Sequence, residues 1–371
     1  MRTIVAIAAL LCAPWLAGAG AEAATPPSGK STRAEGHRAQ AGTAYRERDD
    51  FIRFAAEVAA RRAWDPAWVR DQLSDARQLA RVAQLIMPPP AGVAKNWTAY
   101  RDRFVEPRRV RAGADFWNAN EEALRRAQSV YGVPPEIVVG ILGVETFYGA
   151  MMGGFRVIDA LATLAFDFPR GRSDRSAFFR DELEELLALA RHEGIRADSI
   201  RGSYAGAIGW PQFMPGSVNR HAVDFDGDGH VDLRQSVADA IGSVAHFLQQ
   251  HGWQRGMPTH FEVQPPHDEV ARATLLAPDI EPRFSAQRMR ELGALLAPDA
   301  AGFDGPLALV EVHNGSAAPS HLAGTQNFYV LTRYNRSSYY ARAVIALGQA
   351  VAAAHEATPA HSPNPMTSAR P

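Results

Sequence analysis

Residues 133–154 restrict the possible folds of this chain more than any other part of its sequence. Pro134 and Pro135 suit the first turn of a helix, because the N–H group that proline lacks would have no intrahelical partner there. Glu136 complements the positive end of such a helix. Helical spacing then places Glu145 on a face otherwise made of valine, isoleucine and leucine. An aromatic pair and a glycine-rich exit follow. The stretch therefore predicts an apolar helix that carries one carboxyl group.

Glu145 has two interpretations. A glutamate at the exposed edge of an amphipathic helix is the commoner one for a residue taken alone. If the carboxyl group is buried instead, desolvation raises its pKa, and a raised pKa is the property that a general acid needs. The rest of the chain has to decide between them.

Residues 1–23 have the pattern of a secretory signal peptide, with Arg2 at the start, a short apolar core and an Ala-Glu-Ala cleavage site. A membrane anchor is the alternative, but the apolar run is too short to span a bilayer. Lipidation is disfavoured because Cys12 lies inside the apolar core. Cleavage after Ala23 removes the only cysteine. We therefore expect an exported, soluble periplasmic protein with no disulfide and no cysteine-ligated zinc.

The remainder divides into three parts. Residues 24–45 are rich in Pro, Gly, Ser and charge and predict a flexible linker, and residues 356–371 predict a disordered tail. Residues 46–355 predict one folded domain, since 46% hydrophobic content over 371 residues can form a large core. A net charge of −1 gives no electrostatic case for binding nucleic acid or an anionic membrane. We expect no membrane span.

Helical periodicity dominates the folded part. Helices are expected at 46–86, with a second start at Asp65-Pro66, and at 96–104, 107–131, 134–149, 157–166, 176–192, 236–251 and 339–355. Strand-like composition at 261–263, 307–313 and 328–332 predicts a small β region at about 259–333, with a helical insert near 286–296.

Residues 224–239 contain the sharpest motif. Acidic residues at positions 1, 3, 5 and 9 and a glycine at 6 match a calcium loop of the EF-hand type. Position 12 is Gln235 in place of the usual glutamate, and Asp239 could supply that carboxylate from the next helix. The candidate ligands are Asp224, Asp226, Asp228, His230 and Asp239. An Asp/Gly-rich surface turn is the alternative. We expect a structural Ca²⁺ rather than a catalytic one.

Residues 203–216 are dense in Gly, Pro and aromatic residues, which is typical of a backbone that closely approaches another group. Aromatic residues in and around this segment either pack in the core or stack on sugar rings; they are Tyr100, Tyr148, Tyr204, Trp210, Phe213, Phe247 and Tyr334. The sequence has no H-E-x-x-H, G-x-S-x-G or Walker-type motif, which disfavours zinc peptidases, serine hydrolases and P-loop NTPases.

These motifs occur in one order along the chain. The segments 144–149, 203–215, 224–232, 239–244, 251–253 and 332–341 closely resemble the lytic murein transglycosylase B family, glycoside hydrolase family 103. The resemblance runs from about Phe51 to Val351. It implies an α+β, mainly α fold, with a lysozyme-like helical core, an added helical region and a small β-containing region.

The resemblance also implies an activity. Members cleave the β-1,4 bond between N-acetylmuramic acid and N-acetylglucosamine without net addition of water, leaving a 1,6-anhydro-muramoyl end. Glu145 matches the catalytic position, acting as acid and then as base, with the 2-acetamido group of the substrate in place of a second carboxylate. No cofactor is required for this chemistry. A hydrolytic muramidase and a non-catalytic peptidoglycan-binding or scaffold protein remain the alternatives.

Further roles follow from the motif positions. Ser203 and Gln212 would bind the sugars, and Tyr334 and Asn335 would line the subsite at the cleaved bond. The remaining candidates are aromatic or basic; they are Tyr100, Phe247 and Tyr204 for stacking, and Arg170 and Arg175 for peptide-stem or lactyl carboxylates. The expected partners are peptidoglycan glycan strands and other cell-wall enzymes, and the expected state is a monomer.

Overall fold

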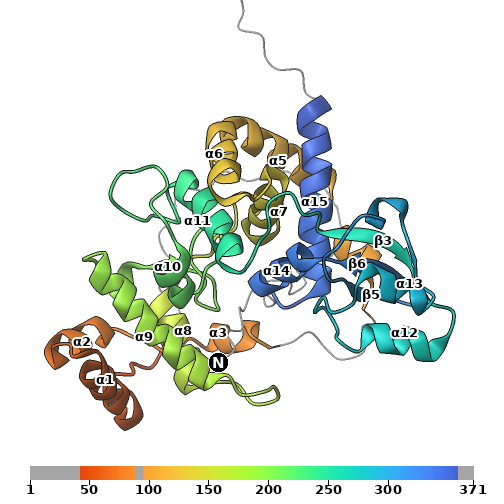
Figure 1. Cartoon of the computed structure of the whole chain (residues 1–371). Helices are drawn as coiled ribbons and strands as arrows, with labels where there is room; N and C mark the ends of the chain where they lie inside the picture. Colours follow the sequence, from red (N-terminus) through yellow and green to blue (C-terminus); the bar gives the residue numbers. More distant parts are fainter. Residues whose placement is uncertain (1–41, 88–94, 358–371) are drawn as a thin grey trace, which may run out of the picture.

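The structure, a computed structural model, describes residues 42–87 and 95–357. Helices form most of it, and a small sheet lies to one side (Figure 1). The predicted signal peptide and most of the predicted linker and tail lie outside the described residues. Two boundaries are wrong. Tyr45 is only 1% exposed and its N–H donates to the Ala76 carbonyl at 3.0 Å, so the folded part begins before residue 46. The last helix continues to Ala357.

The N-terminal helices pack on two later ones. They are α1 (Asp49–Arg62), α2 (Pro66–Leu73) and α3 (Ala80–Leu85), beside α8 (Val157–Phe166) and α9 (Ser176–His192). The helix predicted at 46–86 is thus three helices. Asp65 starts the second one as the sequence predicts, because its carboxylate accepts the Ala67 N–H at 2.8 Å. The bounds of α8 and α9 match the predicted 157–166 and 176–192.

The apolar stretch forms α7 (Pro135–Thr146), and four helices surround it. They are α5 (Pro107–Ala119), α6 (Glu121–Tyr131), α11 (Val237–Gln250) and α15 (Ser338–Ala357). The helix predicted at 107–131 is broken at Asn120, whose φ of −126° is not helical. The backbones of α7 and α15 nearly touch, since a Cβ on Gly140 would lie 2.3 Å from the Val344 carbonyl oxygen and one on Gly348 would lie 2.1 Å from that of Glu136.

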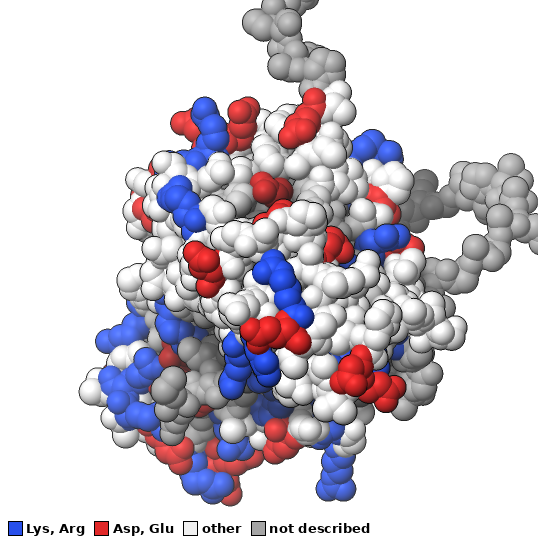
Figure 2. All heavy atoms as spheres, turned by 45° about the vertical axis from the view of Figure 1, so that its right-hand side comes forward, with Lys and Arg blue, Asp and Glu red and all other residues white. Residues whose placement is uncertain are grey.

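The β region has a core of its own, separate from the large helical core. An antiparallel sheet has the order β4-β3-β6-β5, formed by β3 (His260–Gln264), β4 (Leu295–Leu296), β5 (Ala308–Asn314) and β6 (Ala317–Gly324). Helices α12 (Glu269–Leu276) and α13 (Ala286–Glu291) accompany it. The face that includes this region carries charges of both signs on a mostly uncharged surface (Figure 2).

One predicted strand is wrong. Residues 328–332 belong to helix α14 (Gln326–Tyr334). Thr325 caps this helix by accepting the Asn327 N–H at 3.1 Å, and Phe328 and Leu331 are fully buried at helical spacing. Burial of that face outweighs the strand propensity of the aromatic and β-branched residues. Helix α10 (Pro215–His221), α12 and strand β6 were not predicted.

The remaining elements are short. They are α4 (Trp97–Arg101), the two-stranded sheet of β1 (Phe155–Arg156) and β2 (Arg201–Gly202), and the 3₁₀ turns η2 (Ala197–Ser199) and η3 (Pro298–Ala300). Within the described residues, no single helix is long and apolar enough to cross a bilayer; α6 and α7 together reach that length and composition but meet at a bend of 116°.

Candidate active site

Glu145 is the second-last residue of α7 and is only 6% exposed. The hydroxyl group of Tyr340, from the first turn of α15, donates a hydrogen bond to its Oε1 at 2.7 Å. Burial raises the pKa of Glu145 to about 8, and the Tyr340 hydrogen bond opposes this rise because it stabilises the carboxylate. The carboxyl group is therefore mostly protonated at neutral pH, as the second interpretation of its sequence predicts.

The end of α7 is held in an uncommon backbone conformation. Phe147 and Tyr148 have φ of 51° and 53°, the left-handed region that non-glycine residues seldom adopt, and Gly149 continues it at 82°. Thr146 joins this turn to residues 203–216, called here the Gly/aromatic segment. Its Oγ1 donates to the Trp210 carbonyl oxygen at 3.1 Å and accepts the Gly149 N–H at 3.1 Å. The turn that ends the helix carrying Glu145 is thus held against residues 203–216.

The Gly/aromatic segment is fixed by its own polar side chains. Ser203 is 4% exposed, and its Oγ accepts the N–H groups of Ala205 at 3.3 Å and Ala207 at 3.1 Å. Gln212 has a φ of 51° and donates from Nε2 to the Gly209 carbonyl at 2.8 Å. Such local bonds hold irregular backbone where helix or sheet bonds are absent.

Two buried amide oxygens in this part of the structure have no donor among the described residues. They are Oε1 of Gln212, which is 5% exposed, and Oδ1 of Asn335, which is 3% exposed. A buried acceptor left without a donor costs about 1–3 kcal/mol. Each oxygen is therefore available to a donor of a bound molecule.

Tyr334 and Tyr340 support each other. Their rings stack with centroids 6.2 Å apart and planes 12° from parallel. The Tyr334 hydroxyl donates to the Pro211 carbonyl at 2.6 Å, so α14 is tied to the Gly/aromatic segment. Tyr334 is 3% exposed. Through its ring stacking, Tyr334 holds Tyr340 in place, and Tyr340 in turn holds Glu145.

The structure places Phe247 in a cluster of aromatic rings. Its ring is 4% exposed, stacks on His251 with centroids 4.0 Å apart and meets Tyr334 edge-on at 4.9 Å. The stacking of Phe247 on a sugar ring stays a prediction. Tyr204 is also buried, at 9% exposure, whereas Tyr100 is half-buried beside Tyr339 at 5.8 Å.

The two predicted arginines do not contact Glu145. Arg170 is exposed and lines a cavity of about 490 Å³ formed by the loop between α8 and α9. Arg175 is half-buried and its guanidinium lies 4.9 Å from the centre of the Phe178 ring. The lining of that cavity does not include Glu145.

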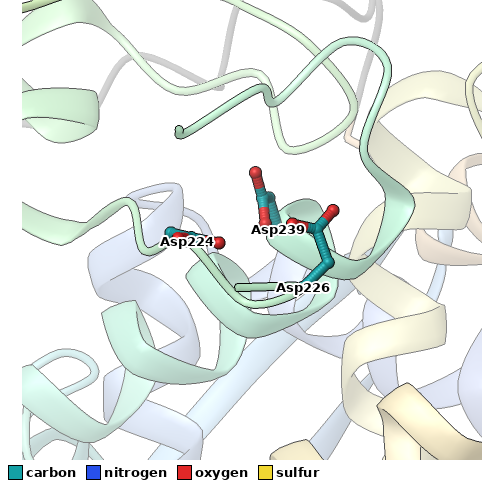
Figure 3. Close-up of side chains that lie close together, drawn as sticks. All are labelled: Asp224, Asp226 and Asp239. Atoms are coloured by element: carbon teal, nitrogen blue, oxygen red, sulfur yellow. The ribbon is translucent and has the colours of Figure 1, made fainter. Parts of the chain in front are cut away.

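Three of the five ligands predicted in the acidic loop, residues 224–239, form a candidate metal centre. Asp224, Asp226 and Asp239 bring carboxylate oxygens within 4.8 Å of one another (Figure 3). Asp239 is 1% exposed and accepts the N–H groups of Phe225 at 2.7 Å and Asp232 at 2.8 Å, which fixes its orientation. Three carboxylates around one point suit a hard cation such as Ca²⁺.

Asp228 and His230 lie outside that cluster. The Asp228 carboxylate accepts the His230 N–H at 2.8 Å, a local turn bond. The exposed His230 ring faces Glu193 at 4.0 Å from its Nδ1. The carboxylate cluster therefore contains three of the five predicted ligands.

Comparison with known proteins decides the family. Residues 47–349 match the family described as the transglycosylase SLT domain. This chain belongs to that family. It is 38% identical to the membrane-bound lytic murein transglycosylase B of Escherichia coli K12 over 343 residues, 89% of this chain and 90% of the relative.

Solved structures agree. The soluble lytic transglycosylase SltB1 of Pseudomonas aeruginosa is 39% identical, with a TM-score of 0.74 over 83% of this chain and all of that one. The E. coli lytic transglycosylase Slt35 in complex with calcium is 38% identical, with a TM-score of 0.73 over 85% of this chain and 97% of that one. P. aeruginosa SltB3 in complex with NAG-NAM-pentapeptide is 28% identical, with a TM-score of 0.70 over 83% and 79%.

One contact of this transglycosylase is not predicted from the sequence. Tyr340 lies in one of the motifs on which the family resemblance rests, but the sequence predicts no role for it. In the structure its hydroxyl group donates a hydrogen bond to Glu145. The signal that could have found it is helical position: Tyr340 is buried near the start of α15, and Gly348 further along shows how closely this helix approaches α7.

Proposed function

We propose that this transglycosylase cleaves the β-1,4 bond between N-acetylmuramic acid and N-acetylglucosamine of peptidoglycan, with Glu145 acting first as acid and then as base. One observation carries the proposal: Glu145 is buried, has a pKa raised to about 8, and has one oxygen held by the Tyr340 hydroxyl. A carboxyl group that is protonated at neutral pH can donate its proton to a leaving oxygen.

The reaction balances without water. Glu145 gives its proton to the glycosidic oxygen as the bond to C1 breaks, and the 2-acetamido group of the same sugar stabilises the positive charge that develops at C1. The Glu145 carboxylate then takes the proton of the C6 hydroxyl, whose oxygen bonds to C1. The products are a free 4-hydroxyl end and a 1,6-anhydro-muramoyl end, and Glu145 is protonated again.

The electrostatics of Glu145 suit a single-carboxylate mechanism. Hydrolases of this bond type generally use two carboxyl groups about 5–9.5 Å apart. The pKa of Glu145 is raised by burial and not by a neighbouring carboxylate. We propose that Oε1 of Gln212 and Oδ1 of Asn335 accept hydrogen bonds from sugar hydroxyl or acetamido N–H groups, since both are buried without a donor in the described part.

Digestion of purified sacculi tests this function. The released muropeptides are analysed by mass spectrometry, and we expect products lighter by one water than reducing-end products. Glu145→Gln keeps the shape of the side chain and should abolish release while the protein stays folded by circular dichroism. Products with reducing ends would indicate a muramidase, and binding to sacculi without release would indicate a non-catalytic protein; either result overturns the proposal.

We also propose a structural Ca²⁺ at Asp224, Asp226 and Asp239, which would tie the acidic loop to the start of α11. Adding millimolar CaCl₂ should raise the Tm of the chelator-treated protein by a few degrees, because a ligand that binds only the folded state stabilises it. Asp226→Asn should reduce this shift, and Asp115→Asn, an exposed change on α5, should not. Equal shifts in both variants would refute the site.

Its site of action follows from the substrate. We propose that the protein is exported and works in the periplasm, as the pattern of residues 1–23 predicts. Mass analysis of the N-terminus of the protein isolated from the periplasmic fraction checks this, with a start at Ala24 expected.

A further inference from the structure

A cavity of about 470 Å³ is lined in part by residues that directly follow the candidate active site in the sequence. Asn335 belongs to that site, and the next three residues, Arg336 to Ser338, line the cavity together with Tyr339 at the start of α15. The opposite wall is the β region, through β5 and the turn after α12. Its volume falls within the range of about 300–1,000 Å³ that is usual for small-molecule sites.

Two positively charged side chains, those of Arg336 and Lys95, line the cavity. Among the described residues, neither Arg336 nor Lys95 has an ion-pair partner, and both are exposed. The Lys95 ammonium lies over the face of the Tyr339 ring, 6.0 Å from the ring centre. The Tyr339 ring is itself fixed, because its hydroxyl oxygen accepts the His313 N–H at 2.7 Å. Such cations form strong hydrogen bonds with carboxylates.

The same cavity also holds two carboxylates. Asp279 follows α12 and is exposed, and Glu311 on β5 is half-buried with its Oε2 2.9 Å from Nε2 of His321. Charges of both signs therefore line one cavity. A neutral sugar can hydrogen-bond these groups but neutralises none of them, whereas a molecule with both carboxylates and an ammonium group pairs with charges of both signs.

We infer that this cavity is a subsite for the peptide stem of peptidoglycan, in which Arg336 and Lys95 bind stem carboxylates and Asp279 and Glu311 bind the ammonium group of a diamino acid. The inference rests on the proposed function, because the stem is attached to the muramoyl residue that Glu145 would cleave. The stem is the part of that substrate which carries both signs of charge. Arg170 and Arg175, both in the α8–α9 loop, do not line this cavity, and Arg170 lines a separate one.

The test compares two substrates for each enzyme. One is peptide-bearing glycan strands, and the other is the same strands after an amidase has removed the stems. The ratio of kcat/KM on the first substrate to that on the second is the readout. We expect the double variant Lys95→Ala/Arg336→Ala to lower this ratio about tenfold. Arg336→Lys, which keeps the charge, should retain most of it, and Arg53→Ala, an exposed arginine on α1, should match the wild type.

The outcomes separate the inference from the function it rests on. The subsite is refuted if the double variant loses activity to the same extent on both substrates, or keeps full activity on both. In either case its ratio is unchanged, although anhydro products still form. If the wild type forms no anhydro product from either substrate, the proposed function itself fails. A melting curve for each variant, expected within a few degrees of the wild type, ensures that the ratio is measured on folded protein.

Discussion

At the scale of single residues, two opposing effects act on the Glu145 carboxyl group. Burial favours the protonated form, while the Tyr340 hydroxyl favours the ionised form by donating to Oε1. The first effect is larger, so the pKa lies at about 8. Because Oε1 is occupied, Oε2 is the oxygen that remains to carry the proton. Tyr340 is therefore a positioning residue for both steps of the proposed reaction.

Tyr340→Phe removes that donor with little change of shape. The carboxylate loses stabilisation, so the pKa of Glu145 rises further. The protonated group is then a weaker acid, which slows the step that protonates the glycosidic oxygen. We expect kcat to fall by about 10- to 100-fold, a typical share for one acid–base contact. Wild-type kcat/KM should fall as pH rises through about 8, and the variant should show this fall at higher pH. Tyr329→Phe, whose hydroxyl contacts Arg333, is the control. An unshifted pH profile would argue against the role.

At the scale of elements, the site depends on how closely α7 and α15 pack, since one carries Glu145 and the other Tyr340. The contact is possible only because glycines face backbone on both helices: Gly140 faces Val344 and Gly348 faces Glu136. A side chain at either glycine would meet a carbonyl oxygen that cannot rotate away. The distance between the two helices, and with it the 2.7 Å hydrogen bond to Glu145, is set by these positions.

Gly348→Ala tests this packing. Alanine favours a helix by about 1 kcal/mol over glycine, but overpacking costs about 1–3 kcal/mol, and its Cβ would lie 2.1 Å from a backbone oxygen. We expect the clash to dominate, with a lower free energy of unfolding in urea and lower activity. Gly154→Ala has no neighbour within 4 Å of its Cβ and should behave as the wild type. A more stable Gly348→Ala protein would contradict the close packing.

At the scale of the whole molecule, keeping a carboxyl group protonated couples folding to pH. The pKa of Glu145 is about 8 in the folded protein against an ordinary value of 4.5. Between these values the unfolded chain releases a proton that the folded chain keeps, so the stability contributed by Glu145 is full at low pH and is lost as pH rises toward 8. The pKa of Glu182, raised by burial to about 7, acts in the same direction.

Glu145→Gln removes one of these titrations. The variant should be more stable than the wild type, and its advantage should grow from pH 5 to pH 8 by at most about 1.4 kcal/mol per pH unit. Urea unfolding at several pH values measures this difference, and Glu182 cancels because both proteins contain it. A difference that stays constant with pH would mean that Glu145 titrates alike in the folded and unfolded chains.

Local patterns in the sequence determined a large part of this protein. The apolar helix with its terminal glutamate, the bounds of α8 and α9 and the Asp65 cap follow from residues near one another in the chain, and the structure confirms them. The family follows from several motifs that occur in order along the chain, and the comparisons confirm it. Helical spacing and capping act within a few residues, so they can be read without knowing the fold. The roles of Ser203, Gln212 and Asn335 remain predictions.

Tertiary structure decided the rest. Residues 328–332 form a helix because burial of a helical face outweighs their strand propensity. Phe247 stacks on His251 in an aromatic cluster, and Asp228 and His230 lie outside the carboxylate cluster. Whether Glu145 is exposed or buried, and that Tyr340 bonds it from 195 residues away, depends on the approach of α15 to α7. Such contacts join distant parts of the chain, and burial, which sets the pKa of Glu145, exists only once those parts have packed together.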